Sequence, residues 1–463
     1  MTRRALALVL LLLLAAAGCV VAGLRDTRRV AHASTPSATP ATTPMLSARR
    51  TPALVVDQVA TTRLQQQLAT TTAGVSACYD VVSDAGAPLA SAGAEQPLAP
   101  ASTQKLLTAT AALTVFGPQY RYTTNVVAAA KPDDGVVERV WLVGSGDPVL
   151  STPAYQTYLA GQALTRGDVT TPLAQLADGL VAAGVRAIPG GILGDDHLFD
   201  TDRSVPSWPA RYLADGNVGP LGALTVDDGL AAPRFAQTTD PAVNAAAQLS
   251  ALLVARGVAV GPAGRGNAPA SATTLASVTS PTLHDIVTSM LSSSDNNTAE
   301  LLTRLLGTRV ATPGTTQAGT TVIAAQLTKL GVDTTGLHLV DGSGLSRDDR
   351  TTCTTLLQVL RLASTRPDLR ALTDGLPVAA QRGTLATVFQ RTPLAGKLHA
   401  KTGSLDGVTG LVGDLDVHDP LEFAFLANGS FPESSGITLR ERVAGVLATY
   451  PDAPSPSALV PGP

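Results

Sequence analysis

The strongest constraint on the fold of this chain is an apolar run that begins at Leu106 and ends at Phe116. The run is apolar on nearly every face of a helix, which predicts a helix buried in the middle of a domain. Gly117-Pro118 is a typical helix stop. Ser102 and Lys105 fall in the first turn of this predicted helix, and residues three apart share a helix face.

This pair of residues can form an activated nucleophile. Burial lowers the pKa of a lysine, and a neutral amine can accept the proton of a serine hydroxyl. Serine is also common at helix starts, so the pair alone has a purely structural explanation. The chain contains only five lysines, and arginine supplies most of its positive charge. Because arginine cannot lose its proton, the use of lysine at position 105 favours the catalytic interpretation.

Composition narrows the class of protein. The chain has 463 residues, which is enough for two or three domains, and 44% of them are hydrophobic, as expected of a well-buried globular protein. The net charge is −3, and no basic stretch is interleaved with aromatic residues. We therefore expect no nucleic-acid partner.

The N-terminal segment has the pattern of an export signal. Two arginines near the start are followed by an uninterrupted apolar run over residues 5–24, which is also long enough to span a bilayer. Ala31-His32-Ala33 and Ala17-Gly18-Cys19 are competing processing sites. We predict a signal peptide or membrane anchor over residues 1–33 and a Pro/Ser/Thr-rich linker over 34–55. The protein is expected to act outside the cytoplasm and to meet the membrane only through its N-terminal segment.

Two cysteines remain besides Cys19. Cys78 and Cys353 can form a disulfide in an oxidising compartment, or each can be a buried free thiol. The sequence leaves both alternatives open. No spacing of cysteines or histidines is typical of a metal site, and we expect neither a metal nor a cofactor.

Predicted strands lie at both ends of the chain and predicted helices lie between them. The strands are predicted over 75–82, 89–92, 398–403, 408–416 and 421–428, and the helices over 56–70, 283–291, 298–306, 352–362 and 437–447. The economical fold is α+β, with one antiparallel sheet packed against a helical region.

A stretch with a different sequence pattern, residues 119–282, interrupts this predicted fold. Short strands are predicted over 124–128, 136–143, 191–193 and 221–226, and helices over 172–183 and 241–256. We predict a catalytic domain formed by 56–118 and 283–450, an inserted strand-rich domain over 119–282, and a Pro-rich tail over 451–463. The run 195–200 contains three aspartates and a histidine, which we interpret as a solvated turn rather than a metal site.

Three short motifs follow one another in a fixed order. They are Ser102-x-x-Lys105, Ser294-Asp295-Asn296 and Lys401-Thr402-Gly403. Each motif alone is weak, because polar loops and strand ends often contain such residues. Together, on a buried helix, an interhelical loop and a strand, they form the set found in penicillin-binding proteins and class A β-lactamases.

Beyond these motifs, residues 65–450 resemble the low-molecular-mass class C penicillin-binding proteins, the D-alanyl-D-alanine carboxypeptidase/endopeptidase family. Gly144-Ser145-Gly146-Asp147-Pro148 and the segments 194–200 and 220–224 are similar to family signatures within the insert. Residues 341–347 are the most distinctive match outside the three motifs. His197 departs from the family, which more usually has serine there. The resemblance implies a penicillin-binding, serine β-lactamase-like transpeptidase fold interrupted by an insert.

The resemblance also implies a role for each residue that carries chemistry. Ser102 would attack the carbonyl between two D-alanines of a peptidoglycan stem peptide and form an acyl-enzyme, with Lys105 as general base. Ser294 would relay a proton to the leaving amine, with Lys401 setting its electrostatics. Asn296 would bind the substrate backbone. The amine is released as D-alanine, water frees the shortened peptide, and β-lactams act as inhibitors.

The remaining implied residues bind the substrate at the strand of the third motif. Lys401 and Thr402 would receive the terminal carboxylate, and Gly403 leads to Ser404. The backbone N–H groups of Ser102 and Ser404 would form the oxyanion hole.

Two other functions compete with a DD-peptidase. A β-lactamase shares all three motifs, but its core needs no long interval between Ser102 and Ser294. A catalytically silent module that only binds cell wall is the other alternative, and the intact Ser102, Lys105, Ser294 and Lys401 argue against it.

Overall fold

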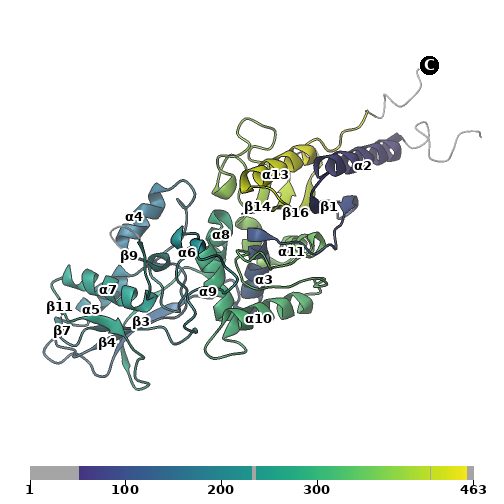
Figure 1. Ribbon diagram of the computed structural model, residues 1–463. Coiled ribbons are helices and arrows are strands. Elements are labelled where there is room, and N and C mark those ends of the chain that lie inside the picture. Colours follow the sequence, from purple (N-terminus) through teal and green to yellow (C-terminus); the bar gives the residue numbers. More distant parts are fainter. Residues whose placement is uncertain (1–51, 232–235, 418, 456–463) are drawn as a thin grey trace, which may run out of the picture. The chain divides into compact units, whose positions relative to one another are not determined.

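The structure is a computed structural model that describes residues 52–231, 236–417 and 419–455 (Figure 1). The predicted signal or anchor over 1–33, the linker over 34–51 and the tail over 456–463 lie outside the described residues. No helix within the described ranges is both long enough and apolar enough to cross a bilayer. Helix α2 (Pro52–Thr71) begins within the segment predicted as a linker. Proline is favoured in the first turn of a helix, and an apolar run follows it here.

The predicted antiparallel sheet is present and joins the two ends of the catalytic chain. Its strand order is β14-β15-β16-β1-β2, and every neighbouring pair is antiparallel. The strands are β1 (Ser76–Ser83), β2 (Pro88–Ala92), β14 (Leu398–Leu405), β15 (Val408–Leu415) and β16 (Leu421–Asn428). Since β1 pairs with β16, the sheet brings N-terminal and C-terminal strands together, and β14 forms one edge.

Each face of this sheet is covered by helices. Along β16, Phe423 and Phe425 belong to the core under α2 and α13 (Glu433–Leu447), while Ala424 and Leu426 belong to the core under the helical region. This alternation is the period of two that a strand imposes. The helical region consists of α3 (Lys105–Phe116), α8 (Leu283–Ser293), α9 (Asn296–Gly307), α10 (Thr316–Lys329), α11 (Cys353–Thr365) and α12 (Ala371–Asp374).

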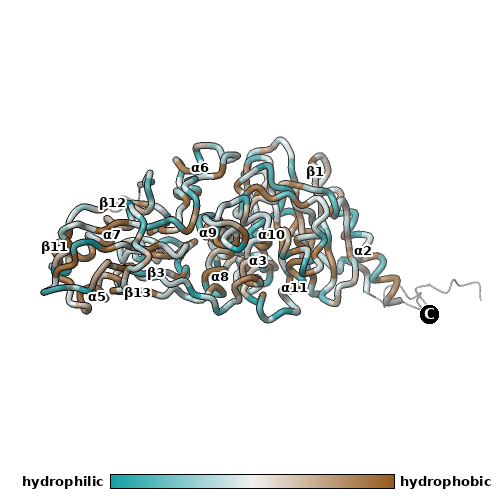
Figure 2. Tube along the Cα trace, turned by 90° about the horizontal axis from the view of Figure 1, so that it is seen from below, coloured by the Kyte–Doolittle hydropathy of each residue, from teal (hydrophilic) through white to brown (hydrophobic). Residues whose placement is uncertain are grey.

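Helix α3 is the centre of the helical region, as its apolar run predicts. Every residue from Lys105 to Leu113 is buried. Helix α3 contacts α8, α9, α10 and α11, and Figure 2 shows it among these helices. Gly117, with a φ of 82°, ends the helix in a backbone conformation that favours glycine.

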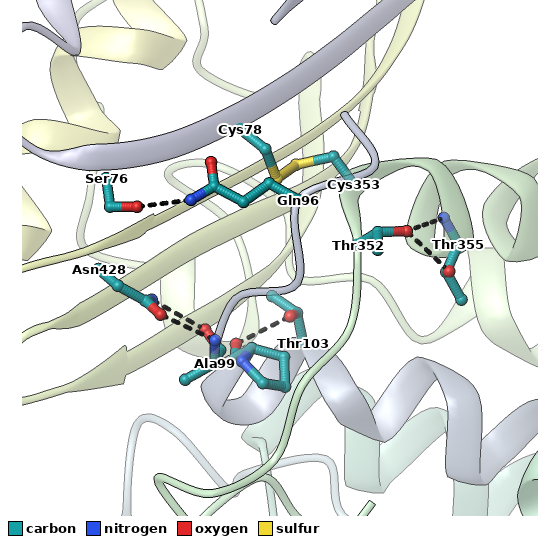
Figure 3. Close-up of a disulfide and its surroundings, with 10 residues drawn as sticks. Ser76, Cys78, Gln96, Ala99, Thr103, Thr352, Cys353, Thr355 and Asn428 are labelled. Carbon is teal, nitrogen blue, oxygen red and sulfur yellow. Dashed lines mark hydrogen bonds between the residues drawn. A yellow bond between two sulfur atoms is a disulfide. The ribbon is translucent and has the colours of Figure 1, made fainter. Parts of the chain in front are cut away.

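The structure decides between the two alternatives for the cysteines, because Cys78 of β1 and Cys353 at the start of α11 form a disulfide (Figure 3). Close to it, the amide side chain of Asn428 accepts from the N–H of Ala99 at 2.8 Å and donates to its carbonyl at 3.1 Å. These bonds anchor the segment that leads into Ser102 to the end of β16.

A second sheet draws all its strands from within 123–279. Its order is β12-β8-β4-β3-β13, and α5 and α7 pack on it. The strands are β3 (Thr123–Ala128), β4 (Val140–Val143), β8 (Ile192–Asp195), β12 (Ala263–Arg265) and β13 (Thr273–Thr279), and the helices are α5 (Ala174–Ala182) and α7 (Pro241–Val254). Shorter elements are α4 (Pro153–Gly161), α6 (Arg211–Ala214), β5 (Leu150–Ser151), β6 (Thr171–Pro172), β7 (Ala187–Ile188), β9 (Leu230–Ala231), β10 (Ala236–Gln237) and β11 (Ala259–Val260).

The chain leaves and re-enters the helical region at one place. The N–H of Ser280 donates to the carbonyl of Tyr122 at 3.0 Å, and the N–H of Leu283 donates to that of Tyr120 at 2.8 Å. The first and last long strands of the insert, β3 and β13, also pair with each other. The predicted domain bounds themselves stay a prediction.

Some predictions within the insert are wrong. The stretch 221–226 is irregular rather than a strand; its Ala223 carbonyl accepts from the N–H of Gly146 in a loop of the insert. Asp195 and Asp196 are buried and not in a solvated turn. Asp196 forms ion pairs with Arg203 and Arg265, at 2.9 and 2.5 Å, which the sequence pattern alone does not show.

Candidate active site

Ser102 lies in a tight turn that precedes α3 rather than in the helix itself. The turn is the 3-10 segment η1 (Ala101–Gln104), and α3 begins at Lys105. Ala101 has a φ of 47°, which is costly for a residue with a side chain. Glycines surround the turn: a side chain at Gly344 or at Gly403 would collide with the backbone of residues 100–101. Because these two glycines have no side chain, the segments that contain Gly344 and Gly403 can approach Ser102 closely.

Lys105 connects Ser102 to two other parts of the chain. Its Nζ lies 2.8 Å from Ser102 Oγ, 2.7 Å from Asn296 Oδ1 and 2.8 Å from the backbone carbonyl oxygen of Ser343. An ammonium has three donors, so these three partners account for all of them. Lys105 is completely buried, whereas Ser102 is partly exposed.

The second motif forms the junction between α8 and α9. Ser294 has a left-handed backbone, with a φ of 64°, and ends α8. The carboxylate of Asp295 accepts from the N–H groups of Asn297 and Thr298 and so caps α9. This junction turns the side chains of Ser294 and Asn296 toward two different lysines.

The third motif lies on the edge strand β14. Lys401 is completely buried, and its Nζ donates to Ser294 Oγ at 2.9 Å and to the carbonyl of Thr402 at 3.0 Å. The hydroxyl of Thr402 lies 2.8 Å from that of Thr384. The guanidinium of Arg440 donates to the Ser404 hydroxyl and, at 3.1 Å, to the carbonyl of Gly403.

The structure therefore brings the predicted residues together in two linked groups. One group is Ser102, Lys105 and Asn296, and the other is Ser294 and Lys401. Helix α9 and its preceding loop join them, because Ser294 and Asn296 are two residues apart. Thr402, Gly403 and Ser404 follow Lys401 along the strand that packs against η1.

Burial and neighbouring charges set the protonation of both lysines. Burial lowers the pKa of Lys105 to about 8, although the carboxylates of Asp295, Asp341 and Glu300 act in the opposite direction. The pKa of Lys401 is lowered well below its ordinary value, first by burial and then by the positive charges of Lys105 and Arg440. A lysine with a pKa of about 8 is a free amine in about one molecule in ten at pH 7, so it can act as a base.

The insert supplies contacts that the sequence pattern did not predict. Asn296 Nδ2 donates to the carbonyl of Asn217 at 2.7 Å. The buried side chain of Asn297 accepts from the N–H of Gly219 at 2.7 Å and donates to the carbonyl of Asp228 at 3.0 Å. Among the described residues, the second N–H of the Asn296 amide has no hydrogen-bond partner, so a substrate can accept from it.

A cavity of about 440 Å³ adjoins Ser294 and Asn296 on the side of the insert. Tyr155 and Tyr158, which stack on each other, form part of its wall, and Asp168 contributes a carboxyl group. Burial raises the pKa of Asp168 to about 7. Within the described ranges, no group of three or more His, Cys, Asp or Glu residues could hold a metal ion.

Comparison with known proteins identifies the family. The sequence model of the D-Ala-D-Ala carboxypeptidase 3 (S13) family matches residues 55–239 and 232–450. The chain belongs to this family. A carboxypeptidase of Mycobacterium tuberculosis is 34% identical over 349 residues, which cover 73% of this chain and 72% of the relative. The D-alanyl-D-alanine carboxypeptidase of Actinomadura sp. (strain R39) is 30% identical to this chain. The aligned region covers 80% of this chain and 81% of the relative.

Solved structures agree on the fold of this S13 protein. Penicillin-binding protein 4 from Haemophilus influenzae superposes with a TM-score of 0.69 at 22% identity, covering 83% of this chain and 99% of that one. The predicted family, the penicillin-binding fold and the class of enzyme, a serine-type D-Ala-D-Ala carboxypeptidase, are confirmed. A peptidase of this cell-wall family acts outside the cytoplasm.

Proposed function

We propose that this S13 carboxypeptidase releases the terminal D-alanine of peptidoglycan stem peptides through an acyl-enzyme on Ser102. The observation that carries the proposal is the distance of 2.8 Å between Lys105 Nζ and Ser102 Oγ, with Lys105 fully buried. The neutral amine of Lys105 takes the proton of Ser102 as its oxygen attacks the carbonyl carbon between the two D-alanines. These steps need neither a metal nor a cofactor, because proton transfer and oxyanion stabilisation suffice for acyl transfer.

The other residues act on the charges that develop during the reaction. The N–H groups of Ser102 and Ser404 receive the oxyanion, and losing such a donor typically costs about 10²–10³ in rate. Ser294 relays the proton that Lys105 took from Ser102 to the departing amine of D-alanine, and Lys401 holds the Ser294 hydroxyl in place. Water then attacks the acyl-enzyme and frees the shortened peptide.

Substrate binding uses the edge strand and the start of α9. Asn296 binds the peptide backbone through its second N–H, while its oxygen stays with Lys105. Lys401 and Thr402 receive the terminal carboxylate, next to Gly403. β-Lactams acylate Ser102 in the same way, which makes them inhibitors. The N-terminal segment carries the chain out of the cytoplasm, as an anchor or a cleaved signal.

The test is the intact mass of the protein during incubation with penicillin, for the wild type and for Ser102→Ala. We expect a stable adduct of one penicillin on the wild type only, together with D-alanine release from a pentapeptide ending in D-Ala-D-Ala. Rapid loss of the adduct with steady consumption of penicillin would instead indicate a β-lactamase. No adduct and no D-alanine release would indicate a silent binding module. A cross-linked peptide dimer as substrate measures endopeptidase activity.

A further inference from the structure

The segment 341–346 forms a third arm of the site beside the loop of Ser294 and the strand of Lys401. Its contribution is one backbone atom, the carbonyl oxygen of Ser343, which accepts from Lys105 Nζ at 2.8 Å. This carbonyl and Asn296 Oδ1 are the two groups that hold the amine of Lys105 against Ser102. The direction in which the Ser343 carbonyl points therefore matters to the base.

The side chain of Glu300, on α9, holds the backbone of the segment at Gly342 and Ser343. It is completely buried, and its Oε1 accepts from the N–H of Gly342 at 3.0 Å and from the N–H of Ser343 at 2.7 Å. The segment lies directly on α9, because a side chain at position 342 would collide with Thr303. Glu300 thus fixes the peptide unit 342–343, which directly precedes the peptide unit that carries the Ser343 carbonyl.

Two other buried carboxylates, those of Asp341 and Asp349, hold neighbouring peptide units of the segment. Asp341 accepts from the N–H of Gly344, which lies in the same planar peptide unit as the Ser343 carbonyl, and from the N–H of Ser346. Asp349 accepts from those of Val340 and Asp341, at 2.6 and 3.3 Å. Within the described part of the chain, no carboxylate except Glu300 is hydrogen-bonded to Ser343.

Both hydrogen bonds of Glu300 to the segment are made through its first oxygen, Oε1. Oε2 is buried and has no hydrogen-bond partner among the described residues. A buried carboxyl group with one oxygen unpaired destabilises a fold.

We propose that Glu300 is a positioning residue for the reaction. Together with Asp341, which holds the N–H of the same peptide unit, Glu300 orients the Ser343 carbonyl, and this carbonyl in turn holds Lys105 Nζ against Ser102 Oγ. The inference rests on the proposed role of Lys105 as the general base. Glu300 touches neither substrate nor Ser102, so its effect on the reaction passes through Ser343 and Lys105.

The test separates binding of penicillin from the acylation step. Time courses of intact mass at several penicillin concentrations give a dissociation constant and an acylation rate constant. For Glu300→Ala we expect the rate constant to fall about 10- to 100-fold, since small displacements of a catalytic group have effects of this size, with little change in the dissociation constant. Glu300→Gln keeps an oxygen at the position of Oε1 and should retain the rate within about threefold.

Asp349→Ala is the matched control. It also removes a buried carboxylate that accepts from two backbone N–H groups of this region, but it does not touch Ser343. We expect a lower unfolding temperature and an acylation rate close to that of the wild type. If Asp349→Ala slows acylation as much as Glu300→Ala does, general order of the segment explains the effect and the proposal is wrong.

A second comparison keeps the inference testable if Glu300→Ala does not fold. Glu300→Asp shortens the side chain by one methylene, so its oxygen no longer reaches Ser343, and acylation should slow while Glu300→Gln stays fast. Equal rates for the two variants would overturn the proposal. Lys105→Met, measured in parallel, tests the proposed function separately from the role of Glu300. If Lys105→Met is acylated as fast as the wild type, Lys105 is not the base, and the proposed function fails together with the role of Glu300.

Discussion

Lys105 and Lys401 are equally buried, yet their surroundings are opposite in charge. Lys105 has the carboxylates of Asp295, Asp341 and Glu300 in its field, and the pKa of its amine falls only to about 8. Burial lowers the pKa of Lys401 well below its ordinary value, and the positive charges of Lys105 and Arg440 act in the same direction. The comparison teaches that burial alone does not determine how a buried lysine titrates. The neighbouring charges decide which of the two amines keeps its proton longer as the pH rises.

The first prediction concerns the lysine bonded to the nucleophile. Lys105→Met keeps the length of the side chain but removes the base, and we expect acylation by penicillin to slow about 10³-fold, within the usual range for a general base. The measurement is the time course of the adduct by intact mass. Lys329→Met, which changes an exposed lysine, is the control and should acylate normally. If Lys105→Met is acylated at the wild-type rate, Lys105 is not the base, and the contrast between Lys105 and Lys401 has no bearing on catalysis.

The second prediction concerns stability. A buried lysine whose folded pKa lies below its unfolded value of about 10.5 destabilises the protein at neutral pH. This cost shrinks as the pH rises through the folded pKa toward the unfolded one. Lys401→Met should therefore raise the free energy of unfolding by roughly 1–4 kcal/mol at pH 7, a typical gain for replacing buried charge by an apolar group. The gain should fade toward pH 10.5.

Urea unfolding at several pH values measures this difference. Lys105→Met serves as the matched variant, and we expect it to gain less, because it leaves Asp295, Asp341 and Glu300 without their cation. A larger gain for Lys105→Met than for Lys401→Met would show that the assignment of the two electrostatic environments is wrong.

The third prediction is a pH profile. If the neutral amine of Lys105 is the base and its pKa is about 8, the acylation rate should rise about 50-fold from pH 6 to pH 8 and level off above about pH 9. Stopped-flow or quenched mass measurements with saturating penicillin record this profile. A rate that does not change between pH 6 and 9 would contradict it.

The prediction with the smallest expected effect tests which neighbouring charge raises the pKa of Lys105. Asp295 is the carboxylate that raises the pKa of Lys105 most. Asp295→Asn removes this charge but keeps a residue suited to capping α9. We expect the midpoint of the pH profile to move to lower pH by less than about one unit. A shift to higher pH would mean that another group controls the profile.

The sequence was sufficient where local patterns carry the information. The buried helix α3, the strands at both chain ends and the three motifs follow from periodicity and spacing, and the structure joins Ser102 to Lys105 and Ser294 to Lys401. Ser343 and Glu300 could not be predicted in the same way. Ser343 acts through a backbone carbonyl, which leaves no mark on residue type, and Glu300 is an ordinary residue for the middle of a helix.

The errors in the insert have a related cause. Asp196 looked like part of a solvated turn because its partners, Arg203 and Arg265, lie on other segments of the insert. The stretch 221–226 has the apolar content of a strand, but it bonds to a loop through Ala223 instead of pairing in a sheet. Pairing between distant segments decided both outcomes, and a local window contains no information about it.

The adjacent exit and return of the chain, at Tyr122 and Ser280, also bears on how such an enzyme can evolve. A segment whose two ends are already neighbours can be gained, lost or exchanged in one genetic event without reshaping its host. In this protein such an exchange would not be neutral, because Asn217, Gly219 and Asp228 hold Asn296 and Asn297. The insert can therefore vary freely at its far end, while the few residues that reach the start of α9 are constrained together with the catalytic loop.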